Sequence, residues 1–396
     1  MRKFGREKLL RLVVGRHRRA RGASECGGCR HLQNLPYRRP VRTPGNTCSP
    51  GQVDAPQPVV AVDPNHGGAD NSRFAATVRH HSATTPPVKL LRSLDELSAT
   101  ERGGAVAVGN FDGVHRGHAE LTARLRAQAR RVGGPAVVFT FDPHPAWILR
   151  PQSAPTPLTW VDRKAALLAE LGVDVMVAYP TDEALLNLTA REFFDRILVG
   201  ALGAKALVEG TNFCFGHDRT GTIDVLRQFA TEAGIQLEAV EAVRFDDDIV
   251  SSSRIRTLIH DGRLAEAGRL LTRPYRIRGL VRHGAARGGK LGFPTANVDG
   301  VDTLLPGSGV YAGRAWVKGT PWPAAVNVGP NPTFGEQALK IEAHLIDFHG
   351  NLYGELLELD FAAQLRPVKK FAGLEELKTQ LAADVQQART IVEQMD

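Results

Sequence analysis

A strand-like apolar run ends in a glycine-rich turn that carries two histidines three residues apart. The segment reads AVAVGNFDGVHRGH over residues 105–118, and a helical pattern follows it. Glycine lets the backbone approach a nucleotide closely, and a helix that begins after a buried strand favours phosphate at its N-terminus. Two imidazoles there, His115 and His118, could donate hydrogen bonds to the charge that develops on phosphate in a transition state. We therefore predict that these two residues are catalytic. The residues predicted to bind the nucleotide or its phosphates are Gly109, Phe111 and Gly117.

Two other interpretations of the histidines are a metal-binding pair and two incidental surface residues. A spacing of three suits chelation from a helix less well than a spacing of four. No further cluster of metal-ligating residues lies near His115 and His118 in the sequence. The pattern thus favours a nucleotide site over a metal pair.

A second glycine-rich segment is basic and leads into a short extended stretch that carries Thr295 and Asn297. It reads RHGAARGGKLGFPTAN over residues 282–297 and contains no Walker A motif. Backbone amides and cations can nevertheless surround phosphates, while hard oxygen ligands hold Mg²⁺. Taken alone, the segment is also compatible with an ordinary loop of a β-barrel.

The first segment requires a framework that brings strand ends together. Apolar runs alternate with helical patterns from residue 104 onward, and helices around 253–271 close this part. Such alternation predicts a doubly wound α/β domain, in which helices cover both faces of a parallel sheet. One predicted helix begins with a capping box, Thr189 with Glu192. The predicted strands are 105–109, 136–141, 173–179, 204–210 and 236–243, and two predicted helices are 118–132 and 189–202.

After Pro274 the sequence changes to short alternating segments that Gly, Pro and Asn turns separate. A single amphipathic helix, 373–395, ends the chain. This texture predicts a small antiparallel β-barrel with a C-terminal helix. Because the join is short, we expect the α/β domain and the barrel to pack together. The predicted domains are an extension over 1–87, an α/β domain over 88–273 and a barrel over 274–396.

Positive charge is concentrated at one end of the chain, whose net charge is +8. Residues 1–87 hold 15 Lys and Arg against 5 Asp and Glu, whereas the other 309 residues hold 35 against 37. The basicity therefore gives no reason to expect that the body binds nucleic acid. No apolar run approaches the roughly 20 residues that cross a bilayer, so we expect no membrane span.

Residues 1–87 lack sustained periodicity and are rich in Arg, Pro, Gly and Ser, which predicts disorder. Their first 20 residues could form a basic helix for targeting, for RNA or for a membrane surface. We favour a non-functional extension, with the native start near Val78 or Val88.

Cysteine usage indicates a reducing compartment. Cys26, Cys29 and Cys48 lie in the extension and, with His31, form only a partial zinc pattern. Cys214 is the one cysteine of the body, which leaves it no partner there for a disulfide. A cytoplasmic location is expected.

The segment GNFDGVHRGH resembles the HxGH motif of the nucleotidyltransferase superfamily. In this longer form it resembles the adenylyltransferase module of prokaryotic bifunctional riboflavin kinase/FAD synthetases. Three further motifs follow in the family's order: FTFDPHP at 139–145, EGTNFCFG at 209–216 and VSSSRIR at 250–256. The resemblance implies a Rossmann-like fold and adenylylation of FMN by ATP to give FAD and pyrophosphate.

These motifs supply the remaining residues of the first predicted site. Ser252 and Ser253 offer hydroxyls and amides to phosphate, while Arg254 and Arg256 offset charge on the leaving pyrophosphate. Asn212 is the candidate for orienting the nucleotide or the flavin phosphate. For FDPHP, contact with ligand and a rigid turn around a packed histidine both remain open.

The stretch GFPTAN at 292–297 is similar to the signature of the riboflavin kinase barrel, and NPTFG at 331–335 and KIEAH at 340–344 also match that family. The resemblance implies that Thr295 and Asn297 hold the Mg²⁺ bound to ATP. It also implies that Glu342 is the general base for the riboflavin 5′-hydroxyl. One departure is Ser308, which stands where the family often has an acidic residue. Four further residues are predicted here: Gly288 and Gly292 for ATP, and Arg366 and Phe371 in a flap near the flavin.

The resemblance covers residues 88–396 and implies a bifunctional enzyme of FAD biosynthesis. Its expected small molecules are riboflavin, FMN and ATP with Mg²⁺, and its expected state is a monomer or a weak homo-oligomer. One alternative is another adenylyl- or cytidylyltransferase with a barrel appendage, which GFPTAN and NPTFG oppose. The other is a non-catalytic flavin-binding regulator, which the intact candidate catalytic residues oppose.

Overall fold

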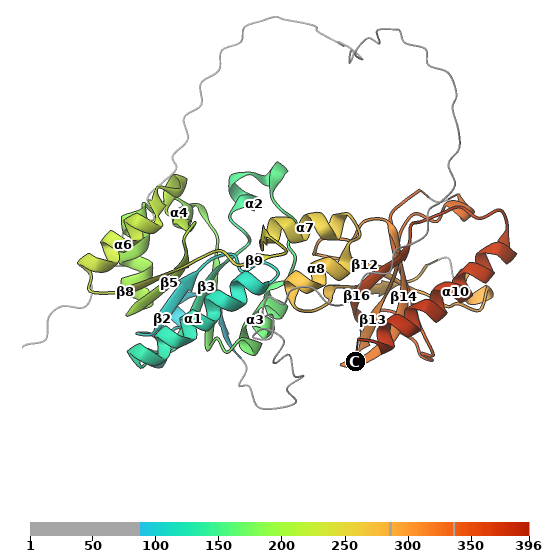
Figure 1. Cartoon of the computed structure of the whole chain (residues 1–396), viewed down its shortest axis with the longest axis horizontal. Helices are drawn as coiled ribbons and strands as arrows, with labels where there is room; N and C mark the ends of the chain where they lie inside the picture. The colour runs from blue at the N-terminus through green and yellow to red at the C-terminus, as the bar shows by residue number, and fades with distance from the viewer. Residues whose placement is uncertain (1–87, 285–286, 336, 396) are drawn as a thin grey trace, which may run out of the picture. The chain divides into compact units, whose positions relative to one another are not determined.

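The computed structural model describes residues 88–284, 287–335 and 337–395. The predictions made for residues 1–87, including the partial zinc pattern, lie outside these residues. Within them a helix-covered parallel sheet comes first and a closed antiparallel barrel second (Figure 1). Both architectures expected from the sequence are therefore present.

The parallel sheet has six strands in the order β1-β4-β3-β2-β5-β8. The chain builds β3 and β4 on one side of β2 and then returns to place β5 on the other side, which is the reversal of a doubly wound sheet. The short edge strand β1 pairs in parallel with β4 and was not predicted. The strands are β1 (Lys89–Leu91), β2 (Ala105–Val108), β3 (Ala136–Asp142), β4 (Val175–Pro180), β5 (Ala206–Gly210) and β8 (Gln236–Val240).

Successive side chains of the central strands enter two different hydrophobic clusters, one on each face of the sheet. On β2, Val106 and Val108 belong to the cluster that α6 (Ile223–Glu232) covers, whereas Ala105 and Ala107 face α1 (Arg116–Val132) and α3 (Val161–Glu170). Because both faces are buried, these strands are mostly apolar instead of alternating with polar residues, and their polar exceptions Thr140 and Glu209 are buried as well.

The predicted helix 189–202 is continuous but changes its winding. Its capping box forms, since the Thr189 hydroxyl accepts from the Glu192 N–H at 3.1 Å and the Glu192 carboxylate accepts from the Thr189 N–H at 3.1 Å. After α5 (Ala190–Phe193) the chain winds as a π-helix over Phe194–Ala201, and Leu202 N–H donates to the Ile197 carbonyl, five residues back. The wider turns place Phe194, Ile197 and Leu198 in the core.

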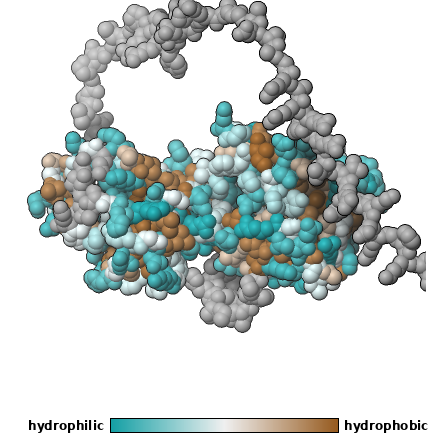
Figure 2. Space-filling view, turned by 180° about the vertical axis from the view of Figure 1, so that it is seen from behind, coloured by the Kyte–Doolittle hydropathy of each residue, from teal (hydrophilic) through white to brown (hydrophobic). Residues whose placement is uncertain are grey.

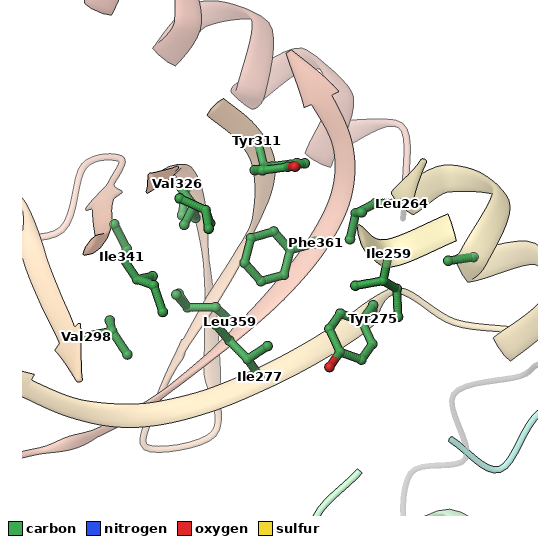
Figure 3. Close-up of a cluster of buried hydrophobic side chains, with 14 of the residues drawn as sticks. Ile259, Leu264, Tyr275, Ile277, Val298, Tyr311, Val326, Ile341, Leu359 and Phe361 are labelled. Carbon is green, nitrogen blue, oxygen red and sulfur yellow. The ribbon is translucent and has the colours of Figure 1, made fainter. Parts of the chain in front are cut away.

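Two helices, α7 (Ser252–His260) and α8 (Leu264–Leu271), lie between the sheet and the barrel in sequence. Figure 3 shows Ile259 and Leu264 beside Tyr275 and Phe361, and these residues belong to one buried cluster with the barrel interior. The helices preceding the predicted boundary at residue 273 thus share a core with the barrel.

The barrel closes in the order β11-β12-β15-β14-β13-β16. Its interior takes every second residue, such as Ala343 and Val326, and the alternate residues point outward. The C-terminal helix α10 (Leu374–Glu393) packs outside on β13 and β14, where Ala388 lies against Ala312. The strands are β11 (Tyr275–Arg282), β12 (Ala296–Asp299), β13 (Gly309–Val317), β14 (Thr320–Gly329), β15 (Lys340–Leu345) and β16 (Leu356–Arg366).

Short elements complete the described chain, and none of its helices is long and apolar enough to cross a membrane. The face drawn in Figure 2 carries hydrophilic residues interspersed with smaller hydrophobic areas. Trp147 and Leu149 are among the exposed large apolar residues, at 47% and 64% exposure. The remaining short α-helices and strands are α2 (Ala146–Leu149), α4 (Glu183–Leu186), α9 (Arg287–Lys290), β6 (Cys214–Phe215), β7 (Gly221–Thr222), β9 (Arg244–Phe245) and β10 (Asp248–Ile249).

Candidate active sites

The loop that carries the two histidines begins where β2 and β5 separate. The two strands pair only at Ala105 with Ala206 and at Val106 with Leu207. Beyond that point the Val108 N–H donates to the buried carboxyl of Glu209 at 2.6 Å instead of to a strand carbonyl. The loop therefore lies at the switch point of the sheet, where open α/β folds bind ligands.

His115 and His118 form a stacked pair at the start of α1, with ring centroids 3.8 Å apart. The His115 backbone N–H donates to Nδ1 of His118 at 3.3 Å. Because Nδ1 accepts, a neutral His118 ring carries its proton on Nε2 and can donate it to a ligand. Nδ1 of His115 is buried and has no hydrogen-bond partner in the described structure, so the pair has unused capacity for hydrogen bonds.

Both imidazoles lie in surroundings that disfavour a positive charge on the ring. Burial lowers the pKa of His115 to about 4, and the charges of Arg273 and Arg256 act in the same direction. Burial is also the main cause that holds the pKa of His118 well below its ordinary value, with further contributions from His115, Lys164 and Arg273. Both rings are therefore neutral near pH 7, and the adjacent cations favour an anionic ligand.

The backbone of this loop is held in a left-handed conformation that residues other than glycine rarely adopt. Phe111 and Val114 have φ of 46° and 41°, and both side chains are only 2% exposed. Such strain costs about 1–3 kcal/mol per residue and persists only where the surroundings fix it. One residue that fixes the loop is Asp112, whose carboxylate accepts from the Leu158 N–H at 2.9 Å and pairs with Arg256.

The first turn of α7 lies against the same loop. The Ser252 hydroxyl donates to the Asp112 carbonyl at 2.9 Å, whereas Ser253 is exposed. Arg254 donates to the Phe245 carbonyl at 3.0 Å. Arg256, besides its pair with Asp112, donates to the Thr156 carbonyl at 3.0 Å. The two arginines predicted to offset pyrophosphate charge are thus engaged with the protein itself, and Arg256 holds the histidine loop through Asp112.

A cavity of about 410 Å³ is lined by residues of both the histidine loop and the FDPHP segment. Its wall includes Asn110 and Asp112 of the loop, His144 of FDPHP and two tryptophans, Trp147 and Trp160. FDPHP therefore lines a cavity and also forms a packed turn, because Nδ1 of His144 accepts from the Ala146 N–H at 3.1 Å. Asn212 does not line this cavity and is exposed on the segment after β5.

Lys164 is a buried cation at this cavity that the sequence did not single out. Its Nζ donates to the Asn110 carbonyl at 2.7 Å, and its side chain is only 7% exposed as a residue. Burial lowers its pKa, which the charges of Asp112 and Asp142 oppose. The sequence offered one sign of this residue, which is a lysine on the inward face of a helix, but no recognisable motif surrounds it.

A second cavity, of about 140 Å³, brings together most of the predicted barrel residues. Glu342 on β15 lies directly opposite Asn297 of β12 on one side and Asn327 of β14 on the other. Directly opposed residues share one face of a sheet, so the three polar side chains lie together on the outside of the barrel. The predicted residues that line this cavity are Gly288, Thr295, Asn297, Glu342, Arg366 and Phe371.

The glycine-rich loop before β12 allows a close backbone approach. A Cβ on Gly288 would lie 2.3 Å from the Phe293 carbonyl oxygen and 3.3 Å from the Thr295 hydroxyl. Gly292 has a φ of +90°, which favours glycine, and it is absent from the lining of the cavity. Glycine is thus required at both positions for the shape of the loop.

The flap residues are tied to the C-terminal helix. Arg366 makes a bidentate pair with the buried carboxylate of Asp384, with Nη2 to Oδ2 at 2.7 Å and Nε to Oδ1 at 3.0 Å. The guanidinium also lies 5.4 Å from the ring centroid of Phe371, whose N–H donates to Thr333 at 3.2 Å. Arg366 therefore holds α10 and Phe371 at the mouth of the cavity.

Asn331 is a further residue of this site that was not among the site residues predicted from the sequence. Its amide donates to Oε1 of Glu342 at 3.1 Å, which orients the carboxylate. It comes from NPTFG, a segment that the sequence placed in the family but without a role. Ser308 is exposed and lies beside Gly329, whose added Cβ would meet the Ser308 Cβ at 3.4 Å.

Comparisons with known proteins assign the two parts of the chain separately. The family model of FAD synthetase matches residues 97–254, and that of riboflavin kinase matches residues 271–392. The matches leave residues 255–270 of α7 and α8 between them, so the domain boundary at 273 stays a prediction. A solved structure described as a macrolide-efflux protein from Streptococcus pneumoniae has a TM-score of 0.69 and 31% identity, and the alignment covers 77% of this chain and 99% of that one.

Curated relatives match along nearly their whole length. The bifunctional riboflavin kinase/FMN adenylyltransferase of Pseudomonas fluorescens is 40% identical, over 77% of this chain and 98% of the relative. The protein of the same description from Escherichia coli K12 is 36% identical, over 76% of this chain and 97% of the relative. Both contain the two activities in one polypeptide, as their description states. The chain belongs to the family of bifunctional riboflavin kinase/FMN adenylyltransferases.

Proposed function

We propose that FMN is adenylylated at the stacked histidines and that riboflavin is phosphorylated at Glu342, in two separate sites of one chain. The observation that carries this proposal is the gathering of residues from distant motifs into two places. His115 and His118 stack at the start of α1, on the loop whose Asn110 and Asp112 line the cavity of about 410 Å³. Thr295, Asn297 and Glu342 line the cavity of about 140 Å³.

In the adenylylation step, a phosphate oxygen of FMN attacks the α-phosphorus of ATP. The new P–O bond forms as the bond to the β-phosphate oxygen breaks, and pyrophosphate leaves. Nε2–H of His118 and an N–H of His115 donate to the oxygens of the five-coordinate phosphorus, where charge accumulates. Neutral rings suit this role because they can donate without a proton being lost to the ligand.

The cavity of about 410 Å³ is our candidate for the flavin pocket of this step. The isoalloxazine ring is flat and aromatic, and Trp147, Trp160 and Phe141 offer faces and edges against which it can pack. Lys164, buried next to Asn110, supplies positive charge for the phosphate end. Asn212 is exposed, and its predicted role stays a part of this proposal, as do those of Ser253 and Arg254.

In the kinase step, Glu342 takes the proton of the riboflavin 5′-hydroxyl. The alkoxide oxygen forms a bond to the γ-phosphorus of ATP, and the bond to the β-phosphate oxygen breaks to release ADP. Asn331 holds the carboxylate through Oε1 and leaves Oε2 for the substrate. Phe371 and Arg366 bound the cavity on the side of α10.

The residues at this site fit Mg²⁺. Thr295 and Asn297 offer a hydroxyl and an amide oxygen, and Mg²⁺ in phosphoryl-transfer sites takes few protein ligands and keeps water and phosphate oxygens. Mg²⁺ bound there would offset charge on the transferred phosphate. The described residues contain no cluster of three or more His, Cys, Asp and Glu that could hold a metal ion.

The test is incubation of the full chain with riboflavin, ATP and Mg²⁺, followed by chromatographic separation of the flavins. We expect FMN and FAD from the native chain, FMN without FAD from His118→Ala, and FAD only from supplied FMN with Glu342→Ala. His260→Ala, on the exposed side of α7, is the matched control. Unimpaired FAD synthesis by His118→Ala, or riboflavin phosphorylation by Glu342→Ala, would refute the corresponding assignment.

The cytoplasmic location and the monomeric or weakly oligomeric state expected from the sequence remain predictions. Gel filtration at two protein concentrations tests the second. A single elution volume at the mass of one chain supports a monomer, whereas a volume that shifts with concentration supports weak self-association.

A further inference from the structure

Two side chains of the barrel line the cavity to which Asn110 and Asp112 of the histidine loop contribute. They are Arg278 on β11 and Asp302 in the loop after β12. Both belong to the part of the chain that the riboflavin kinase model matches. The remaining wall comes from the α/β domain, so this cavity draws on both domains.

A row of charges with alternating sign runs along this cavity from one domain to the other. Asp142 pairs with Arg92 at 3.0 Å, and Arg92 lies 3.7 Å from Asp162. Asp162 lies 3.8 Å from Arg278, which pairs with Asp302 at 2.8 Å. The side chain of Arg278 is the most enclosed of the five, at 27% exposure. Its guanidinium is therefore held from two sides by carboxylates.

Arg278 also lies on the ring of Trp160, with its guanidinium carbon 4.6 Å from the ring centroid. Trp160 is 8% exposed, precedes α3 and lines the same cavity. A guanidinium that is fixed by Asp162 and Asp302 restricts the tilt of this ring. The position of the aromatic wall thus depends on a barrel residue.

The segment that leads to Trp160 is anchored to the barrel by other contacts as well. Pro157 accepts at its carbonyl from the Leu304 N–H at 2.8 Å, and Leu158 packs in the cluster that contains the barrel interior. The Leu158 N–H in turn donates to Asp112 of the histidine loop. Arg278 therefore acts on a wall whose backbone already lies against the barrel.

We propose that Arg278, a residue of the riboflavin kinase domain, is a positioning residue for FMN in the adenylyltransferase site. The inference rests on the proposed assignment of this cavity to the flavin. Arg278 holds Trp160 as the flat surface against which the isoalloxazine packs. The flavin pocket of the α/β domain is then complete only in the presence of the barrel.

The test measures steady-state kinetics of both reactions with the full-length Arg278→Ala variant. We expect the KM for FMN in FAD formation to rise about fivefold, as the loss of one cation–π contact implies, with kcat and the KM for ATP within about twofold. Phosphorylation of riboflavin should be unchanged. Arg278→Lys, which keeps the charge but not the planar fork, should recover part of the effect. In a Trp160→Ala background, Arg278→Ala should add nothing.

Trp147→Ala separates this inference from the assignment of the cavity, because Trp147 lines it from α2 and is 47% exposed. A raised KM for FMN in Trp147→Ala with an unchanged KM in Arg278→Ala overturns the role of Arg278 and retains the pocket. An unchanged KM in both overturns the pocket and the inference together. Equal losses of both activities in Arg278→Ala would mean a general defect of the fold and also overturn the inference.

Discussion

A Cβ atom on Gly117 would lie 3.1 Å from Cε1 and 3.2 Å from Nδ1 of His115. The glycine between the two histidines therefore leaves the space that the first imidazole occupies. The φ of Gly117 is not positive, so its backbone conformation does not require glycine. The close approach of the His115 ring is instead the physical reason for a glycine at this position.

Gly117→Ala is expected to push the His115 ring away from its stacked position. Misplacement of a catalytic group by a few tenths of an ångström to 1 Å lowers turnover by about 10- to 100-fold. FAD formation from FMN should fall by that factor while riboflavin phosphorylation is retained. Gly373→Ala, whose added Cβ meets nothing within 4 Å, is the control. Full FAD synthesis by Gly117→Ala would show that the stacked geometry is not needed.

The low pKa of His115 predicts a loss of stability in mild acid. Its folded pKa of about 4 lies below the ordinary value of 6.5, so between these values the unfolded chain binds more protons. The neutral His115 ring therefore contributes to the free energy of unfolding in full above pH 6.5, and this contribution is lost as the pH falls towards 4. The expected loss between pH 7 and pH 5 is about 2 kcal/mol. Urea unfolding of the native chain and of His115→Gln at both pH values measures it. An equal pH dependence in the two proteins would contradict the prediction.

The pair between Arg366 and Asp384 predicts that α10 depends on one buried carboxylate. Asp384 is 2% exposed, and its replacement leaves the guanidinium without its countercharge. Asp384→Asn should lower the free energy of unfolding by about 3 kcal/mol. Urea unfolding gives this quantity, with Glu375→Gln on the exposed first turn of α10 as the control. A change below about 0.5 kcal/mol, as for ordinary surface substitutions, would mean that packing alone holds the helix.

Thr295→Val tests the proposed ligand of Mg²⁺ without changing the size of the side chain. Removal of one oxygen ligand should raise the Mg²⁺ concentration for half-maximal riboflavin phosphorylation about tenfold, equivalent to about 1.4 kcal/mol. The Mg²⁺ dependence of FAD formation from FMN should stay the same. Thr320→Val, at an exposed position of β14, controls for the substitution itself. An unaltered Mg²⁺ requirement of the kinase step would remove Thr295 from the ligand set.

Local pattern was enough to predict the two architectures. The strands 105–109, 136–141 and 204–210 appear because they are mostly apolar on both faces and therefore suit a sheet covered on both sides. The helix 373–395 and the capping box at Thr189 depend on neighbours in sequence and were also predicted. The edge strand β1 was not predicted, because a strand of three residues carries little periodicity. The π-helical winding after Phe193 was not predicted either, because helix winding responds to core packing.

The sequence by itself determined which motifs belong together and hence the family, since GNFDGVHRGH and GFPTAN are contiguous and need no folded context to be recognised. Only the tertiary structure decided which partners those residues have. Arg256 pairs with Asp112, 144 positions earlier, and Arg366 with Asp384 instead of with solvent. The contribution of Arg278 to a cavity of the other domain has no local signal at all, because it arises from the packing of β11 against the segment before α3. Distances between residues far apart in sequence are set by the fold as a whole, and no short pattern encodes them.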